Sequence, residues 1–459
     1  MDYRQALAFL DAHTNLEGSP APAGTGAALP TAGATEGLSL APIRELMAAL
    51  ADPQHAYRVI HVTGTNGKGS TSRFAAEILA AAGLSVGLLT SPDLERINER
   101  IVWDGRPIPD EEFARVMSLL AAVVPTLEHP PGRFDLLTAL ALVWFADQGV
   151  DVAVVEVGLL GRFDSTNIVE ADVAVLTNLG KDHTDGAEGW KAKVAWEKAG
   201  IIEPDSHVVL GTDDEVFLAA AQAEPHRELW VAGRDFALEN QAMAVGGRAL
   251  DVRTPGADYE QLFLGVHGAF QPDNLVTAIA AVEALLGRPL GSEVLEEALA
   301  DIELPGRFEV ASVDPLVILD GAHNPDGARA AKDTLDTEFA RLGSWVLVFG
   351  LLNGKDPAEM LEAIGAADFD AVILTQPAWS RSVPATELAE AARSLDIAVE
   401  VVPDAVEAFA RAKAVAADDD LILVAGSLYL VGEVRPVARS VVDADDFPVD
   451  RRHNRPAGG

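Results

Sequence analysis

Short apolar runs that alternate with Ala-rich segments constrain the fold of this chain more than any other feature. The first series of runs reads as strands at Arg58–Thr63, Ser85–Thr90, Asp151–Val157, Asp172–Thr177 and His207–Leu210. A second series follows at Leu316–Leu319, Trp345–Phe349, Ala371–Thr375, Ala398–Val401 and Leu421–Val424. Continuous Val, Ile and Leu runs separated by helices indicate a parallel sheet covered on both faces. The pattern therefore predicts two α/β units.

The two series meet near Glu303–Glu309, where Pro-Gly in ELPGRFE ends a helical pattern. We expect a first domain over residues 1–303, a hinge over 304–310 and a second domain over 311–440. Residues 18–37, GSPAPAGTGAALPTAGATEG, contain almost no large apolar side chain, which predicts a flexible segment. Residues 441–459 read as a polar, disordered tail.

The charge balance and the cysteine count exclude several classes of protein. The 459 residues include 34 Lys plus Arg and 71 Asp plus Glu, a formal net charge of −37, and no cysteine. Zero cysteine excludes disulfides, cysteine-based zinc sites and a thiolate nucleophile. The negative charge disfavours nucleic acid and an acidic membrane as partners. The N-terminus lacks the basic start and apolar stretch of a signal peptide, so we expect a cytoplasmic chain. We also expect a monomer.

The most informative stretch is VIHVTGTNGKGSTSRFAAEILAAAG, residues 59–83. An apolar strand runs into Gly64-Thr65-Asn66-Gly67-Lys68-Gly69-Ser70, and an Ala-rich helix follows. Glycines let successive backbone N–H groups point at one phosphate, and the helix N-terminus adds its positive end. Lys68 supplies a point charge, and Ser70 or Thr71 offers a hydroxyl to Mg²⁺. The stretch therefore predicts a nucleotide-phosphate loop.

The spacing departs from the common G-x-x-x-x-G-K-[ST] loop, because Val62 stands at the first glycine and Gly69 follows Lys68 directly. GTNGKGS resembles the nucleotide loop of the Mur-type amide ligases, in the branch of folylpolyglutamate synthase and dihydrofolate synthase. Further motifs resemble that branch in family order from about residue 58 to 432. They are Thr90-Ser91-Pro92, Val155-Glu156-Val157-Gly158, Gly161-Arg162 with Thr166-Asn167, Asp182-His183-Thr184-Asp185, Glu197-Lys198-Ala199-Gly200-Ile201, His267-Gly268 with Gln271 and Asn274, Pro305-Gly306-Arg307, Asp320-Gly321-Ala322-His323-Asn324-Pro325, Gly350 with Lys355-Asp356, and Gly426-Ser427.

The resemblance implies an α/β fold with an N-terminal P-loop-type ATPase domain, whose sheet is mostly parallel, and a smaller C-terminal Rossmann-like α/β domain. It implies that ATP drives amide formation between L-glutamate and a folate, with dihydropteroate as a further acceptor. A carboxylate would attack the γ-phosphate to give an acyl phosphate, and an amine would then displace phosphate. Such chemistry needs positioning and charge neutralisation more than a protein nucleophile.

The resemblance also implies roles for individual residues. Ser70, Ser91, Glu156, His183 and Lys198 would hold two Mg²⁺ ions. Lys198 falls fifteen residues after His183, the position of the family's carbamylated lysine, and a carbamate there would hold the second ion.

The remaining implied roles concern ATP and the incoming glutamate. Asn274, Arg307 and Asp320 would contact ATP together with the loop, and Asp320 and His323 would face the glutamate. Lys68, Lys198, His183 and Arg307 are the implied catalytic residues.

Five departures from the family pattern cluster around the predicted substrate pocket. Leu160 stands at a usual glycine, Asp93 at a histidine, Ser165 at an alanine and Gly354 at an aspartate, and Gly186–Gly189 replaces a large apolar pair. A bulky residue such as leucine adopts a positive φ only at a cost.

Two alternatives stay open at this point. Another Mur-type ligase would act on a cell-wall nucleotide or a different acid. Such three-domain enzymes usually carry a UDP-binding domain before the loop, and only 63 residues precede Gly64. A nucleotide-binding homologue with reduced activity would fit the departures, but it would not need Lys68, Glu156, His183 and Lys198 together.

Overall fold

The computed structural model describes residues 1–14, 31–33, 38–182, 184 and 186–439. The predicted tail 441–459 and most of the predicted flexible segment 18–37 lie outside these residues, and so does His183. Within the described part of the chain, no helix has the length and apolar character needed to cross a membrane.

An eight-stranded sheet forms the centre of the first half, in the order β4-β3-β2-β5-β1-β6-β7-β8. Its strands are parallel except for β3 and β4, which pair antiparallel at one edge. The strands are β1 (Arg58–Thr63), β2 (Val86–Leu89), β3 (Ile101–Trp103), β4 (Arg106–Pro107), β5 (Val152–Glu156), β6 (Val173–Leu176), β7 (His207–Leu210) and β8 (Glu228–Val231). The five strands predicted in the first series are confirmed to within two residues at each end.

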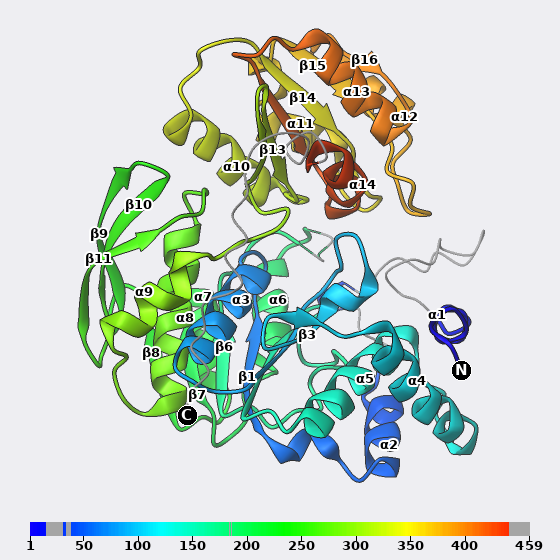
Figure 1. Cartoon of the computed structure of the whole chain (residues 1–459), viewed down its shortest axis with the longest axis vertical. Helices are drawn as coiled ribbons and strands as arrows, with labels where there is room; N and C mark the ends of the chain where they lie inside the picture. The colour runs from blue at the N-terminus through cyan, green and yellow to red at the C-terminus, as the bar shows by residue number, and fades with distance from the viewer. Residues whose placement is uncertain (15–30, 34–37, 183, 185, 440–459) are drawn as a thin grey trace, which may run out of the picture.

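Helices cover both faces of this sheet, as the continuous apolar strands require (Figure 1). On β1, Ile60 and Val62 enter one core with α3 (Lys68–Ala81), α8 (Gln271–Leu286) and α9 (Ser292–Ala300). Val59 points to the opposite core with α1 (Tyr3–Asp11), α2 (Ala41–Ala49), α4 (Asp110–Val123) and α5 (Arg133–Gln148). Further along this side, α6 (Trp190–Ala199) and α7 (Glu215–Ala223) cover β6 and β7.

A separate three-stranded antiparallel sheet packs against the core that contains α3, α8 and α9. The sequence did not predict this sheet. It consists of β9 (Ala237–Ala244), β10 (Gly247–Arg253) and β11 (Asp258–Leu264), with β10 in the middle. Leu250, Leu262 and Leu264 pack into the core formed with α8 and α9. The opposite face carries exposed side chains such as Phe263.

The second series forms a six-stranded sheet in the order β12-β13-β17-β14-β15-β16, parallel except for β12. Its strands are β12 (Glu309–Val313), β13 (Leu316–Asp320), β14 (Trp345–Phe349), β15 (Ala371–Leu374), β16 (Glu400–Val401) and β17 (Leu421–Ala425). One face packs on α10 (Pro325–Glu338), α11 (Pro357–Ala363) and α12 (Ala385–Ser394), and the other on α13 (Ala405–Val415) and α14 (Leu428–Arg439). This confirms the predicted α/β class, with a larger first unit and a smaller second one.

The carboxyl ends of the parallel strands in the two sheets face a common cavity. Thr65 follows β1, Glu156 ends β5 and Asn178 follows β6, while Asp320 ends β13 and Gly426 follows β17, and all five line it. Open α/β sheets place their ligand sites at this edge. The fold therefore directs the loops of both units to one place.

Candidate active site

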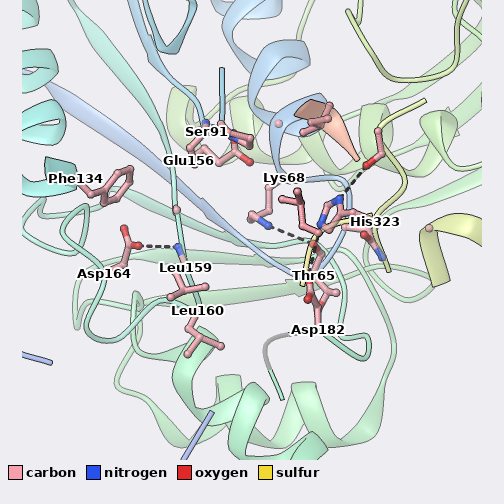
Figure 2. Close-up of a pocket in the computed structure, with 18 of the residues that line it drawn as sticks. Thr65, Lys68, Ser91, Phe134, Glu156, Leu159, Leu160, Asp164, Asp182 and His323 are labelled. Carbon is pink, nitrogen blue, oxygen red and sulfur yellow. Dashed lines mark hydrogen bonds and ion pairs between the residues drawn. The ribbon is translucent and has the colours of Figure 1, made fainter. Parts of the chain in front are cut away.

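A cavity of about 1050 Å³ lies where the two units meet (Figure 2). Its wall contains the phosphate-loop residues Thr65–Ser70 on one side and Asp320–His323 on the other. The wall also includes the residues that follow α1, Ala12–Thr14, together with Pro130, Pro131 and Phe134. The Gly-rich loop of the first unit and the Asp320–His323 segment of the second unit thus line the same cavity.

The phosphate loop has a shape that requires its glycines. Gly64 has φ +151 and Gly67 has φ +80, the left-handed region that glycine adopts without strain. A Cβ on Gly64 would lie 1.8 Å from the Thr177 hydroxyl, and one on Gly67 would lie 2.2 Å from the Asn274 side-chain oxygen. The loop therefore lies directly against β6 and α8, and only glycine fits at both positions.

Contacts to the segment after β6 hold the loop open at the start of α3. The Asn66 N–H donates to the Asn178 side-chain oxygen at 2.9 Å, and the Gly180 N–H donates to the Thr65 hydroxyl at 2.9 Å. The Lys68 ammonium donates to the carbonyl oxygens of Gly64 and Thr65, each at 3.2 Å. These bonds keep the lysine over the loop, where a bound phosphate would meet it.

Glu156 is a buried carboxylate beside the loop, with 3 % of its surface exposed. The Ser91 N–H donates to it at 3.1 Å. Burial raises the pKa of Glu156, and the nearby Lys68 ammonium partly opposes that rise. A Cβ on Gly69 would lie 3.3 Å from the Glu156 carboxylate, so the missing side chain lets the carboxylate approach the loop.

These groups suit a magnesium ion that is held mainly by a nucleotide. Among the described residues no three His, Asp or Glu side chains gather as a metal cluster. Mg²⁺ typically takes one or two protein carboxylates together with substrate phosphate oxygens and waters. Glu156, with the Ser70 and Ser91 residues in the same wall, meets that requirement.

Lys198, near the C-terminal end of α6, lies behind the phosphate loop rather than in the cavity wall. It is 3 % exposed, and its ammonium donates to the Gly64 carbonyl at 2.6 Å. Burial, assisted by the Lys68 charge, lowers the pKa of Lys198 to about 7. At neutral pH the Lys198 side chain is therefore the neutral amine in a large fraction of the molecules.

Asp320 is the buried carboxylate on the opposite wall. It accepts hydrogen bonds from the N–H groups of Phe308, at 2.8 Å, and Ala322, at 2.9 Å. Burial raises the pKa of Asp320, whereas the Arg307 guanidinium lowers it. Arg307 itself lines the cavity and adjoins the segment that joins the two units.

Direct contacts link the two walls. The Asn66 and Asn324 side-chain amides exchange hydrogen bonds of 2.8 and 3.3 Å. Asp182 accepts from the Lys355 ammonium, and its other oxygen lies 3.5 Å from the His323 ring nitrogen. The structure thus brings together every described residue among the predicted site residues, with Gly64 and Lys198 just outside the cavity wall.

Several cavity residues were not predicted from the sequence. Phe134 and Asp135 come from the first turn of α5, and Asp164 comes from the loop after β5. Asp164 accepts hydrogen bonds from the Leu159 and Thr166 N–H groups, and burial raises its pKa to about 6. In the sequence, Asp164 is marked only as an acidic residue in the glycine-containing stretch GLLGRFD. That pattern does not show where its carboxylate lies.

The departures from the family pattern have local partners. Leu160 adopts φ +59, and its carbonyl accepts from the Thr63 hydroxyl at 2.7 Å. Asp93 pairs with the buried Arg100 at 2.5 Å, and the Ser165 hydroxyl donates to Asp135 at 2.6 Å. Gly354 has φ +96, a conformation that aspartate would adopt only with strain. The chain therefore accommodates each of these four residues.

Two family models match the chain. The Mur ligase middle domain matches residues 113–282, and the Mur ligase glutamate ligase domain matches residues 306–428. The second match begins in the segment that leads into β12.

Among curated proteins, the chain is 36 % identical over 378 residues to dihydrofolate synthase/folylpolyglutamate synthase of Mycobacterium tuberculosis, covering 77 % of each chain. A folylpolyglutamate synthase structure from the same organism, complexed with ADP and AMPPCP, aligns with a TM-score of 0.81 at 34 % identity and covers 89 % of this chain and 96 % of that one. A bifunctional folylpolyglutamate synthase/dihydrofolate synthase structure with Mn, AMPPNP and L-glutamate bound has a TM-score of 0.81 at 27 % identity, covering 95 % and 98 %. The chain belongs to the Mur ligase family, in the branch of the dihydrofolate synthase/folylpolyglutamate synthases, which are ATP-dependent ligases.

Proposed function

We propose that this chain joins L-glutamate to a reduced folate, extending a polyglutamate tail, and that it also accepts dihydropteroate. The observation that carries the proposal is the single cavity that holds the phosphate loop of one unit against Asp320 and His323 of the other. Relatives with ATP analogues, Mn and L-glutamate bound support the same set of ligands.

The reaction needs two displacements in this chamber. An oxygen of the acceptor carboxylate bonds to the γ-phosphorus as the bond to ADP breaks. The glutamate amine nitrogen then bonds to the acyl carbon, phosphate leaves with the electron pair, and the amine loses a proton. Each step requires neutralised charge and fixed geometry rather than a protein nucleophile.

The phosphate loop would bind ATP through its backbone N–H groups, with Lys68 turning from the loop carbonyls toward the distal phosphates. The ATP-binding set is Gly64, Thr65, Asn66, Gly67, Lys68, Gly69, Ser70, Asn274, Arg307 and Asp320. Arg307 stands beside the Asp320 carboxylate, so its guanidinium is positioned to meet the γ-phosphate. His323 and Asp320 would receive the glutamate.

Glu156, Ser70 and Ser91 would hold one Mg²⁺, and Lys198 with His183 a second. Bound Mg²⁺ neutralises charge on the phosphate oxygens. The protein's own part is to place Glu156 beside the loop, where the Lys68 charge and the Ser91 N–H favour the carboxylate and oppose the rise in its pKa caused by burial.

Lys198 is a candidate for carbamylation. Its lowered pKa makes the neutral amine available, and the amine nitrogen can bond to the carbon of CO₂ with loss of one proton. The product is an anion, which suits metal binding. The group would then stand behind Gly64, on the loop side of the chamber.

We also propose that the enzyme is monomeric and cytoplasmic. The described residues of one chain line the cavity from both walls, so a second copy is not needed to complete it. Dependence on ATP agrees with the predicted cytoplasmic location.

The test measures phosphate release from ATP with L-glutamate and either tetrahydrofolate or dihydropteroate, with the amide product identified by mass spectrometry. Release that requires both glutamate and one of these acceptors is expected. A UDP-linked cell-wall acceptor serves as the alternative arm. Turnover with that acceptor alone, or nucleotide binding without turnover, would contradict the proposal.

A further inference from the structure

A buried charged cluster joins the two units at a distance from the cavity and is used by no step proposed above. Glu338, the last residue of α10, pairs with Arg248 of β10, and the two side chains are 3 % and 5 % exposed. The His267 ring nitrogen lies 3.0 Å from the same carboxylate, and the Gly268 N–H donates to it at 3.2 Å. We call these four residues the Glu338 clamp.

The clamp fixes the far end of a helix whose near end reaches the active site. α10 has 14 residues, so at about 1.5 Å per residue it spans roughly 21 Å. Its N-cap, Asn324, exchanges hydrogen bonds with Asn66 of the phosphate loop. Figure 1 shows α10 between the β9–β11 sheet and the rest of the second unit. The helix is thus held to the first unit at both ends.

A second route leads from the clamp to the hinge. Phe339 follows Glu338, and its ring lies 4.8 Å from the His267 ring and 5.7 Å from the Phe308 ring. The Phe308 N–H donates to Asp320 at 2.8 Å, and Arg307 directly precedes it. The clamp is therefore connected by packed side chains to two residues of the candidate site.

The clamp also meets the start of α8. The N–H groups of Gly268 and Ala269, just before this helix, are taken by Glu338 and by Thr334 of α10. Asn274, in the first turn of α8, lies against Gly67 of the phosphate loop. Helices from both units that touch the phosphate loop are therefore tied together at this point.

We propose that Glu338 and Arg248 are positioning residues for the ligase reaction. By holding α10, Phe308 and the start of α8 in one arrangement, their ion pair sets Arg307, Asp320 and His323 at their working distance from the phosphate loop. A removed partner would leave a charge buried without its counterion, so the arrangement depends on the pair as a unit. This inference rests on the proposed function.

The test uses Glu338→Gln, which keeps the side-chain shape, and Arg248→Lys, which keeps the charge but loses the planar two-pronged geometry. The matched control is Glu359→Gln, which weakens the exposed inter-unit pair of Glu359 with Lys181. We expect both clamp variants to lower kcat/KM for glutamate by about ten- to hundredfold, as misplaced catalytic groups do. ADP affinity, measured by calorimetry, should fall by a much smaller factor, and Glu359→Gln should match the parent in both.

A second readout does not depend on catalysis. The chain has no cysteine, so spin labels on Leu119→Cys of α4 and Val406→Cys of α13, both exposed positions, report the distance between the units. The clamp variants should broaden that distance distribution. An unchanged distribution, unchanged kcat/KM, or an equal loss of ADP affinity and kcat/KM would overturn the inference. If the parent forms no amide product, the proposed function fails, and the distance measurement alone decides the clamp.

Discussion

Leu160 offers a sharp test of backbone strain at the edge of the cavity. Its φ of +59 is unusual for leucine, yet its side chain is 4 % exposed and packs against Ala32 and Val194. Two substitutions separate these effects. Leu160→Ala removes the packing and keeps the strain, whereas Leu160→Gly removes both.

The free-energy costs of lost packing and of backbone strain decide which of the two variants is more stable. Loss of a buried leucine side chain costs about 2–5 kcal/mol, and the small cluster around Leu160 favours the lower end. A non-glycine residue in the left-handed region costs about 1–2 kcal/mol, which glycine avoids. We therefore expect Leu160→Ala to lose about 2–3 kcal/mol and Leu160→Gly about 1 kcal/mol less than that. Both remain less stable than the parent, because burial outweighs strain.

The assay is thermal unfolding of the two variants beside a control pair at Leu119. Leu119 lies within helix α4 and is 42 % exposed, so there glycine should be less stable than alanine by about 0.8–1 kcal/mol. At Leu160 the order should reverse, with Leu160→Gly melting about 2 °C above Leu160→Ala. Equal stability at Leu160, or alanine above glycine, would refute the claim that this backbone is strained.

Three further outcomes follow from the site. Gly67→Ala places a Cβ 2.2 Å from the Asn274 side-chain oxygen at φ +80. The resulting backbone strain of about 1–3 kcal/mol should distort the loop, so calorimetry should show much weaker ADP binding. The control is Gly83→Ala, where φ is +87 and no atom lies near the added Cβ, and it should leave ADP affinity unchanged. Lys198 has a pKa lowered to about 7, so the unfolded chain binds more protons between that value and the ordinary one of about 10.4. The free energy of unfolding should therefore rise with pH in this window, by about 2 kcal/mol from pH 7 to 9. Calorimetry in CO₂-free buffer should show this rise in the parent and not in Lys198→Met. Glu156→Gln removes a carboxylate charge beside the loop, so the Mg²⁺ concentration for half-maximal activity should increase about tenfold or more, and an unchanged requirement would contradict its role as a metal ligand.

The strands of both main sheets could be predicted because burial on two faces leaves continuous apolar runs such as VAVVE and WVLVF. The β9–β11 sheet could not, since one face is exposed and a register shift lies between Asp251 and Val252. The register shift interrupts the alternation of apolar and polar residues, and that alternation is the sequence signal that predicts a strand with one exposed face.

The residues of the candidate site likewise include some that the sequence predicts and some that it does not. Glu156 and Asp320 end apolar strands, so their place at the carboxyl edge of a sheet could be predicted. The bond from Lys198 to the Gly64 carbonyl joins residues 134 apart in sequence, and it depends on how α6 packs against the sheet. The Glu338 clamp likewise requires knowledge of how the two units meet, which no local pattern carries.

The paired amides of Asn66 and Asn324 have a consequence for synthesis of the chain. They are 258 residues apart, so at about 5–20 residues per second a ribosome takes roughly 10–50 s to translate from one to the other. The bonds that shape the loop, from Thr177 and Asn178, come from residues made much earlier. The contacts from Thr177 and Asn178 that shape the Gly64–Ser70 loop can therefore form while Asn324 and the second unit are still untranslated, and the bonds between the two units form only later.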